Sequence, residues 1–406
     1  MEASLRFRYS AAENGKPVKR AVVYTRDEHK INFADVDSHA VYITEKLQAS
    51  GYETYIVGGA VRDLILGKKP KDFDIATEAN PARIKKLFRN ARIIGRRFRL
   101  VHVYFGSKII EVSTFRSLKD GATSNTFGTI EDDVLRRDFS LNALFYDPVK
   151  QLVVDYVGGM KDIGKRLIRP IINLKDIFTD DPVRMIRAVK YGAAADFKLP
   201  LSLKWRIRKQ SNLLAAVSPS RLTEEIFKII NSPNASEIVS GLDEMGLYRY
   251  LQPCAARLFI TVPGFKARYL KTLAALNNDK VVNPSGYTLV ALIRDYLDDE
   301  ADWDGMLSLE YTERYKNAFV LARKFVLPMN PPRMELENAL RLLFAEHGIT
   351  IKKFRTHERP PRQLHHGAHE LIPAGVKAEA VPEIKPGPAR KRRRRRKKPS
   401  EPGALP

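Results

Sequence analysis

The spacing of hydrophobic positions changes part-way along the chain, and this change predicts two differently built halves. Short runs of β-branched and aromatic residues, bounded by glycine and polar turns, recur up to about residue 155 and predict strands. From there to about residue 347, hydrophobic residues recur every three or four positions, which predicts helices. We therefore expect a head of mixed strands and helices followed by a helical second half, without a repeat of fixed period.

The first half contains signals for both kinds of element. A helix is expected over residues 37–51, with Ser38 as its N-cap and Gly51 as its end, and another over residues 80–90, with Asn80 as N-cap. A strand, a glycine turn and a helix are predicted over 52–68. Further strands are predicted at 71–77, 91–95, 100–105 and 108–115. The clearest helices of the second half are expected at 181–193, 220–231, 235–246 and 287–297.

Two aspartates in the predicted strand at 71–77 are candidates for metal binding. Side chains alternate between the faces of a strand, so we expect Asp72 and Asp74 to project from the same face. Neighbouring carboxylates disfavour each other's ionisation unless a cation lies between them. Glu111 offers a third carboxylate on a neighbouring predicted strand, and hard oxygen ligands of this kind suit Mg²⁺.

Three other short segments could bind a nucleotide. Gly58 and Gly59 form a turn between a strand and a helix, where backbone N–H groups can approach phosphate. Further candidates for phosphate, sugar and base contacts follow in residues 136–142 and 180–187. Each of these segments also has an ordinary structural explanation as a turn or as helix electrostatics.

The charge balance indicates a polyanionic partner. The chain of 406 residues has 70 Lys and Arg against 47 Asp and Glu, a net charge of +23. Its single cysteine, Cys254, excludes an internal disulfide framework, and no apolar run is long enough to span a membrane. The first residues lack the apolar core of a secretory signal, so a cytoplasmic protein is expected.

The most concentrated charge lies near the C-terminus, in a segment from about residue 351 that we expect to be disordered. An unbroken basic run there could contact RNA phosphates. It consists of Arg390, Lys391, Arg392, Arg393, Arg394, Arg395, Arg396, Lys397 and Lys398.

Taken together, seven segments resemble the class II nucleotidyltransferases, which include bacterial poly(A) polymerases and CCA-adding enzymes. These segments are YIVGGAVRD, DFDIAT, IIEVSTFR, RRDFSLNAL, VDYVGGMKDIGKRLIR, DDPVRMIRAVK and SRLTEE. The resemblance covers about residues 35–250. It implies an α+β fold, with a five-stranded mixed sheet in the head followed by helical neck and body domains.

The resemblance also implies a role for each candidate residue. Asp72, Asp74 and Glu111 would be catalytic and hold two Mg²⁺ ions, with Mn²⁺ as a possible substitute. The nucleotide would be bound by Gly58, Gly59, Arg62, Arg137, Asp138, Asn142, Asp181, Arg184 and Arg187. Arg221 and Glu225 match an R-x-x-x-E motif and would brace the base-reading helix. Asp180 stands where the family usually has Glu.

The expected domains are an N-terminal extension (1–34), a catalytic head (35–155), a neck (156–250), an RNA-binding body (251–350) and the tail (351–406). The segments GKKPKDFD and GRRFRLVHV are more similar to poly(A) polymerases, which predicts addition of AMP from ATP to RNA 3′ ends, without a membrane partner. The alternatives are a CCA-adding tRNA nucleotidyltransferase and a non-catalytic RNA-binding relative. The residues alone leave these open.

Overall fold

The structure, a computed structural model, describes residues 6–11, 17–95, 100–117, 126–276 and 286–349. The basic run at 390–398 and the predicted tail lie outside these residues. Nine strands are present in the described part of the chain. They are β1 (Arg6–Ala11), β2 (Pro17–Tyr24), β3 (Thr54–Val57), β4 (Asp74–Thr77), β5 (Ala91–Ile94), β6 (Leu100–Phe105), β7 (Lys108–Thr114), β8 (Leu144–Asp147) and β9 (Leu152–Asp155).

Helices connect these strands, and the regular elements after β9 in the described residues are all helices. Those of the first part are α1 (Arg26–His29), α2 (Ser38–Ala49), α3 (Gly59–Ile65), α4 (Pro81–Leu87), α5 (Ile130–Leu135), α6 (Gly159–Gly164), α7 (Ile177–Asp180), α8 (Val183–Ala195) and α9 (Leu201–Gln210). The later ones are α10 (Pro219–Ile230), α11 (Ala235–Glu244), α12 (Tyr248–Leu251), α13 (Pro253–Thr261), α14 (Phe265–Ala275), α15 (Tyr287–Glu300), α16 (Trp303–Ser308), α17 (Tyr311–Val326) and α18 (Arg333–Glu346).

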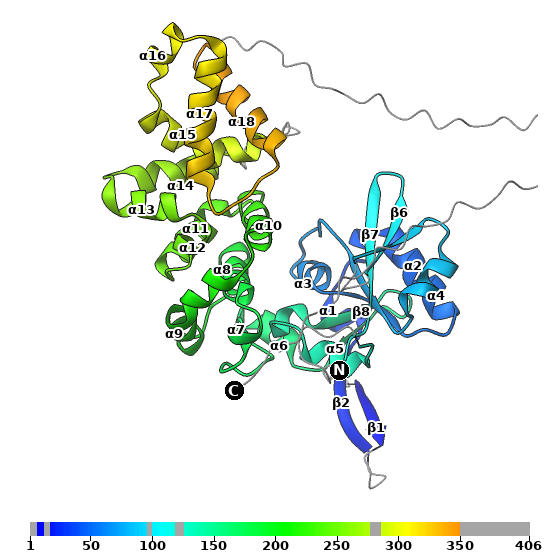
Figure 1. Cartoon of the computed structure of the whole chain (residues 1–406). Helices are drawn as coiled ribbons and strands as arrows, with labels where there is room; N and C mark the ends of the chain where they lie inside the picture. Colours follow the sequence, from blue (N-terminus) through cyan, green and yellow to red (C-terminus); the bar gives the residue numbers. More distant parts are fainter. Residues whose placement is uncertain (1–5, 12–16, 96–99, 118–125, 277–285, 350–406) are drawn as a thin grey trace, which may run out of the picture. The chain divides into compact units, whose positions relative to one another are not determined.

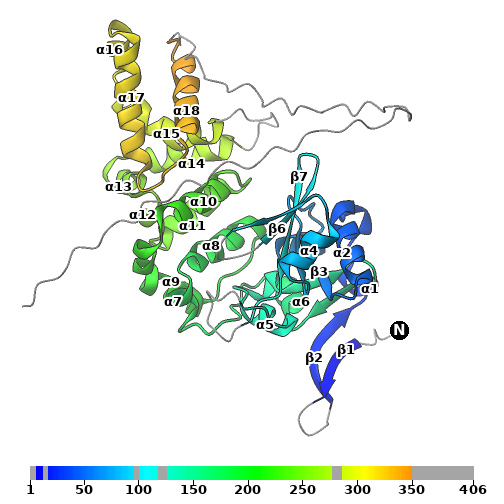
Figure 2. The ribbon, with the colours of Figure 1, turned by 45° about the vertical axis from the view of Figure 1, so that its right-hand side comes forward.

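All nine strands form one mixed sheet in the order β1-β2-β9-β8-β3-β4-β7-β6-β5. Neighbouring strands are antiparallel except β4 and β7, which are parallel. The α+β fold class is therefore confirmed, but the sheet is larger than the five strands expected. Part of the difference is the β1–β2 hairpin, which extends the sheet from the polar N-terminal region and projects from it in both views (Figures 1 and 2).

Alternation along the strands divides the hydrophobic core between the two faces of the sheet. On β3, Ile56 joins a large cluster that contains residues from α2, α3 and α4, whereas Tyr55 and Val57 join a smaller cluster with α5. Figures 1 and 2 show α2 and α4 close to the strands of the sheet. The sheet therefore separates a large apolar cluster on the face of α2 and α4 from a smaller one on the face of α5.

Two local predictions about the strands and helices need correction. The N-cap of α2 is Asp37, whose carboxylate accepts hydrogen bonds from two backbone N–H groups, and Ser38 is the first helical residue. Strand β4 begins at Asp74, so Asp72 lies before the strand and not within it. The Asn80 cap of α4 is confirmed, because its side chain accepts a hydrogen bond from the Arg83 N–H.

The predicted helices of the second half are confirmed as α8, α10, α11 and α15. Helix α11 packs on α8 and on α14, and α15 packs on α14, α17 and α18. Their inward positions are filled by large apolar residues such as Ile238, Leu242 and Leu292, which are fully buried. No helix of the described residues is long and apolar enough to cross a lipid bilayer.

One buried aspartate joins the last strand of the sheet to the helical half. Asp155, which is 1% exposed, ends β9 just before α6. Its Oδ1 accepts hydrogen bonds from the N–H groups of Val157, Gly158 and Gly159 at 3.1, 2.7 and 2.9 Å, and its Oδ2 accepts one from Met160 at 3.0 Å. A single carboxylate thus satisfies four backbone donors that would otherwise be buried without partners.

We expect Asp155→Ala to lower the free energy of unfolding by about 3 kcal/mol or more, because each buried donor left without a partner costs about 1–3 kcal/mol. Asp155→Asn keeps one carbonyl oxygen for these donors and should cost less. Urea unfolding followed by circular dichroism measures both. The exposed Glu45→Ala on α2 is the control and should change stability by less than about 0.5 kcal/mol. An Asp155→Ala protein as stable as wild type would contradict this role.

Candidate active site

The register of three neighbouring strands places two of the predicted carboxylates side by side. Val57 on β3 is opposite Asp74 on β4, and Asp74 is opposite Glu111 on the parallel strand β7. Directly opposed residues project from the same face of a sheet. Because Val57 belongs to the smaller core cluster on the α5 face, Asp74 and Glu111 project on that face too. The two carboxylates come from segments 37 residues apart in the sequence and meet through strand pairing.

The turn after β3 approaches these carboxylates closely. Gly58 has φ 72° and ψ −137°, a conformation that side chains strongly disfavour. A Cβ atom at this position would lie 3.9 Å from Asp74 Oδ2 and 3.8 Å from Arg137 Nη1. Glycine at this position therefore allows the backbone to adopt this conformation, and without a side chain it leaves the space in front of Asp74 open. Gly59 follows as the first residue of α3.

The Asp74 carboxyl group has an unusual electrostatic environment. Although part of its surface faces open space, surrounding protein displaces water from the group and raises its pKa to about 6. This raised pKa includes upward contributions from the negative charges of Glu111 and Asp72 and a downward contribution from Arg137. A carboxylate in this position is stabilised by any added positive charge, which is the property of a cation ligand.

These residues fit a divalent metal ion whose coordination shell is completed by oxygen atoms of the substrate. Within the described part of the chain, no three His, Cys, Asp or Glu side chains are already gathered as a metal site. Two carboxylates on adjacent strands are sufficient for Mg²⁺, which commonly takes one or two protein carboxylates together with phosphate oxygens and water. Glu111 is also within reach of His102 on β6, with 3.5 Å between His102 Nε2 and Glu111 Oε2.

The segment 136–142 forms a hydrogen-bonded network beside the carboxylates. Arg137 donates to Asp133 Oδ2 at 2.9 Å and to the Asn142 carbonyl oxygen at 3.0 Å. Asn142 donates to Asp138 Oδ1 at 3.3 Å and accepts from Arg62 Nη1 at 2.9 Å. Asp138 and Asn142 are buried. The residues predicted to contact the sugar and the phosphates of a nucleotide therefore hold one another in fixed positions.

The start of α8 brings its charged residues to the same place. Asp181 Oδ1 accepts from the Val183 N–H at 3.1 Å, and Asp181 Oδ2 pairs with Arg221 Nη2 at 2.7 Å. Arg184, 6% exposed, donates to the carbonyl oxygens of Ile177 and Arg136 at 3.1 and 3.3 Å. Two of the five N–H donors of its guanidinium are directed at these carbonyls, so the group is firmly oriented and retains further donors.

Ion pairs connect helix α10, which carries the R-x-x-x-E motif, to α8 and to Asp181 before it. Arg221 pairs with Asp181, and the buried Glu225 lies 3.6 Å from Arg187, 3.7 Å from Lys190 and 3.6 Å from Lys228. Arg187 in turn lies 3.8 Å from Asp138. These ion pairs connect α10, α8 and the segment 136–142.

Many of these groups line one cavity of about 730 Å³. Most of the predicted site residues line it, namely Gly58, Gly59, Asp74, Glu111, Arg137, Asp138, Asn142, Asp181, Arg184, Arg187 and Arg221. Asp72, Arg62 and Glu225 are not among the lining residues. Asp72 acts on the Asp74 carboxyl through its charge, and Arg62 and Glu225 contact residues that do line the cavity. Asp180 lines it as well, 3.9 Å from Arg184.

Arg136, from the predicted segment 136–142, also lines the cavity, whereas the sequence did not indicate Val57, Ser113, Arg116, Asp133 and Tyr191. The spacing of two of these residues could have indicated their place in the cavity. Ser113 is two positions beyond Glu111 on the same strand face, and Tyr191 is one helical turn beyond Arg187 on α8. Arg116 and Asp133 depend on how the chain folds back near the sheet, which no spacing predicts.

Comparisons with known proteins agree with this geometry. Residues 54–169 match the family model "Poly A polymerase head domain", and residues 196–259 match "Probable RNA and SrmB-binding site of polymerase A". Poly(A) polymerase I of Salmonella typhi is 38% identical over 340 residues, which are 78% of this chain and 72% of that protein. The chain belongs to the poly(A) polymerase and CCA-adding nucleotidyltransferase family.

CCA-adding relatives of this nucleotidyltransferase match over a shorter span. The CCA-adding enzyme of Geobacillus thermodenitrificans is 38% identical over 224 residues, 54% of this chain and 55% of that enzyme. The crystal structure of the Bacillus stearothermophilus CCA-adding enzyme in complex with CTP is similar with a TM-score of 0.52 and 28% identity, covering 76% of this chain and 82% of that one.

The raised pKa of Asp74 gives this nucleotidyltransferase a testable pH dependence. Because the folded-state pKa, about 6, lies above the usual value of 3.8, ionised Asp74 destabilises the metal-free fold above about pH 6, and this penalty disappears as the pH falls toward 4. In EDTA, Asp74→Asn should raise the Tm at pH 8 and have progressively less effect from pH 6 to pH 4. Thermal unfolding across this range measures the difference. Asp35→Asn, an exposed carboxylate, is the control. A lower Tm for Asp74→Asn at pH 8 would contradict the electrostatic account.

Proposed function

We propose that this protein is a template-independent polynucleotide adenylyltransferase that adds AMP from ATP to RNA 3′ ends. The observation that carries the proposal is the pair Asp74 and Glu111, set side by side on parallel strands in a cavity rimmed by arginines. Relatives named poly(A) polymerase I match 78% of the chain, a larger share than the CCA-adding relatives described above.

In this reaction the RNA 3′ hydroxyl oxygen forms a bond to the α-phosphorus of ATP. The bond from the α-phosphorus to the bridging oxygen breaks, pyrophosphate leaves, and the hydroxyl proton passes to solvent. Mg²⁺ bound by Asp74, Glu111 and Asp72, two ions in our proposal, would lower the pKa of the hydroxyl and neutralise charge on the leaving group. Mn²⁺ could take the same oxygen ligands.

The residues around the metal site would orient the nucleotide. The backbone at Gly58 and Gly59 leaves room for phosphate oxygens, and Arg137 supplies positive charge close to Asp74. Asp138 and Asn142 would contact the sugar. Arg62 would hold Asn142 in place, because their side chains are hydrogen-bonded at 2.9 Å. Arg187 would support Asp138 through an ion pair, with 3.8 Å between Arg187 Nη1 and Asp138 Oδ2.

We propose that Asp181 and Arg184 select adenine. The Watson–Crick edge of adenine has an amino donor beside a ring-nitrogen acceptor, which a carboxylate and a guanidinium can match. Asp181 is positioned by Arg221 and by the Val183 N–H, and Arg184 is fixed by two carbonyl oxygens. Because both groups are oriented by protein contacts before any nucleotide enters, selection would require little reorganisation.

For RNA, we propose that the helical residues 156–250 and 251–350 act as neck and body, and that the basic run 390–398 adds phosphate contacts. The family model for residues 196–259, described as an RNA-binding site, supports the first part of this assignment. CCA addition is the second candidate function. It is favoured by the CCA-adding relatives at 38% identity and by the similar structure bound to CTP.

Incubating the protein with a labelled RNA primer and each NTP separately should yield long extension with ATP alone, and EDTA should abolish it. Asp74→Asn should reduce the rate by orders of magnitude, since the metal loses a negatively charged ligand while the fold is kept. Glu78→Gln, an exposed carboxylate after the same strand, is the matched control and should act like wild type. Extension that stops after a single CCA with mixed NTPs would replace our proposal by the second candidate. Full activity of Asp74→Asn would refute the assigned mechanism.

Asp181→Asn should reduce the preference for ATP over CTP by about tenfold, because a hydrogen bond to a charged acceptor contributes about 1.5–3 kcal/mol and the variant replaces that acceptor with a neutral amide. Competition between the two nucleotides for a common primer measures the ratio of kcat/KM values. Asp176→Asn, which removes an exposed carboxylate at the start of α7, should leave the ratio unchanged. If Asp181→Asn and Arg184→Ala both kept the wild-type preference, base selection would have to lie elsewhere.

A further inference from the structure

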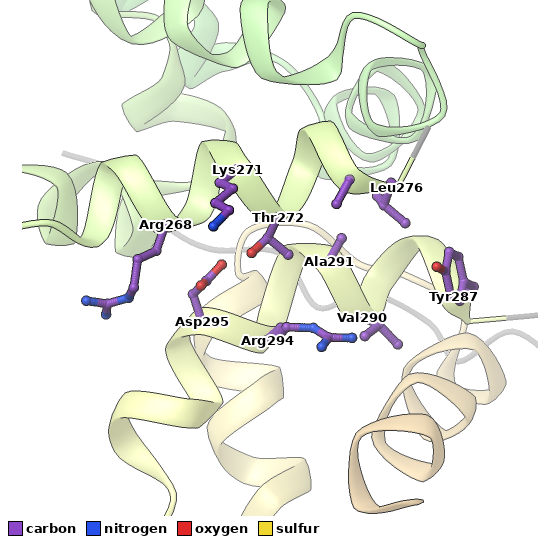
Figure 3. Close-up of a pocket in the computed structure, with 10 residues that line it drawn as sticks. Arg268, Lys271, Thr272, Leu276, Tyr287, Val290, Ala291, Arg294 and Asp295 are labelled. Atoms are coloured by element: carbon purple, nitrogen blue, oxygen red, sulfur yellow. The ribbon is translucent and has the colours of Figure 1, made fainter. Parts of the chain in front are cut away.

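A second cavity, of about 410 Å³, lies in the helical half between α14 and α15 and shares no residue with the site described above. Figure 3 shows its lining, with residues of α14 on one side and those of α15 on the other. Cavities of this size can hold a small ring system, since ligand pockets commonly have about 300–1,000 Å³. The cavity has apolar walls, one buried acid and a basic rim.

The walls suit a flat apolar surface. Leu276 and Val290 line the cavity together with the small residues Ala275 and Ala291, and Tyr287 lies at one end (Figure 3). Ala291 and Val290 are buried, at 3% and 2% exposed, which fixes that wall in the helix packing. The small side chains leave a shallow space between two helices that a ring can enter.

A single carboxylate in this cavity has unused capacity to accept hydrogen bonds. Asp295 on α15 is 8% exposed and lines the cavity. Thr272 on α14 hydrogen-bonds its carboxyl group, but Oδ2 has no hydrogen-bond partner within the described residues. A buried polar atom without a partner costs free energy, so a ligand that donates a hydrogen bond to Oδ2 would gain more here than at the surface.

The opening of the cavity is basic. Arg268 and Lys271 from α14 and Arg294 from α15 line it. Arg268 is paired with Asp299, and Arg294 with Glu346 at 2.8 Å, whereas Lys271 is exposed and makes no ion pair within the described residues. Lys271 is therefore available to an anionic group that enters with the ring.

We propose that this cavity binds a single unstacked nucleotide, with the exocyclic amino group of its base donating to Asp295 Oδ2 and its phosphate next to Lys271. Adenine, cytosine and guanine have such an amino group. Uracil has an N–H donor only between two carbonyl oxygens, which would face the carboxylate. A flat base between apolar walls and a phosphate at a basic rim are the usual elements of single-strand recognition. The inference rests on the proposed function in taking RNA to be a substrate.

The same chemistry is offered by a nucleotide within an RNA strand and by a free nucleotide. Binding should therefore be measured with the full-length protein for two kinds of probe. The first is labelled single-stranded oligonucleotides of A and of U, followed by fluorescence anisotropy. The second is free AMP, whose binding is measured by equilibrium dialysis. AMP can also bind elsewhere on the protein, so only the binding that is lost in the cavity variants is attributed to this cavity.

Two variants and two matched controls make the test specific. Asp295→Asn removes the charged acceptor, and Lys271→Ala removes the free cation from the rim. Asp298→Asn, an exposed acid on the same helix, and Lys316→Ala, an exposed lysine on α17, change the same charges outside the cavity. Because Asp295 is buried, circular dichroism should verify that its variant is folded; Lys271 is exposed, so its variant is expected to fold normally.

We expect Asp295→Asn to weaken binding of the A oligonucleotide about tenfold while binding of the U oligonucleotide changes by less than twofold. Lys271→Ala should weaken both by a similar factor, because it would contact phosphate and not the base. Both controls should bind as wild type. If the free nucleotide is the ligand, the two variants lower AMP binding in dialysis and leave the oligonucleotides unaffected. Wild-type binding of both probes by Asp295→Asn and by Lys271→Ala would overturn the inference.

Primer extension by the wild-type protein separates this inference from the proposed function. Extension with ATP, combined with unchanged binding in both cavity variants, would mean that the cavity inference fails and the proposed function holds. A protein that binds RNA through this cavity but extends no primer with any NTP would mean the reverse.

Discussion

The parallel pairing of β4 with β7 is the constraint on which the site depends. It places the carboxylates of Asp74 and Glu111 side by side, and the displacement of water from Asp74, together with the negative charge of Glu111, raises the pKa of Asp74 to about 6. Such an arrangement is unfavourable for the isolated fold. A cation bound between the two carboxylates would offset their repulsion, and it could at the same time neutralise the phosphates of a nucleotide.

The rest of the cavity is organised around this pair. Positive charge comes from segments that the sheet does not position by itself, namely the segment 136–142 and helices α8 and α10. Their groups are tied together by Arg137 with Asp133, Arg221 with Asp181, and Arg187 with Glu225. These ion pairs orient the arginine side chains, and each guanidinium keeps N–H donors that a ligand could use. A triphosphate would therefore meet cations that are already oriented, which lowers the cost of reorganisation on binding.

Alternation, glycine turns and helical periodicity are local properties, and they predicted five of the nine strands and the main helices. Most of the cavity residues were expected instead from the resemblance to the nucleotidyltransferase family. The paired aspartates illustrate the limit. The pattern places Asp72 and Asp74 on one strand face, yet β4 begins only at Asp74, and the neighbour of Asp74 across the sheet is Glu111. Strand order and register decide such partners, and neither can be deduced from spacing. The N-terminal hairpin that enlarges the sheet was missed for the same reason.

The most direct test of the account is the position of the metal. Crystals of the full chain grown with Mn²⁺ and a non-hydrolysable ATP analogue would show the metal by anomalous scattering. We predict a peak in direct contact with a carboxylate oxygen of Asp74 and with phosphate oxygens of the analogue, within reach of Glu111. Bound nucleotide in the cavity with manganese absent from Asp74, or held only by other residues, would contradict the central claim.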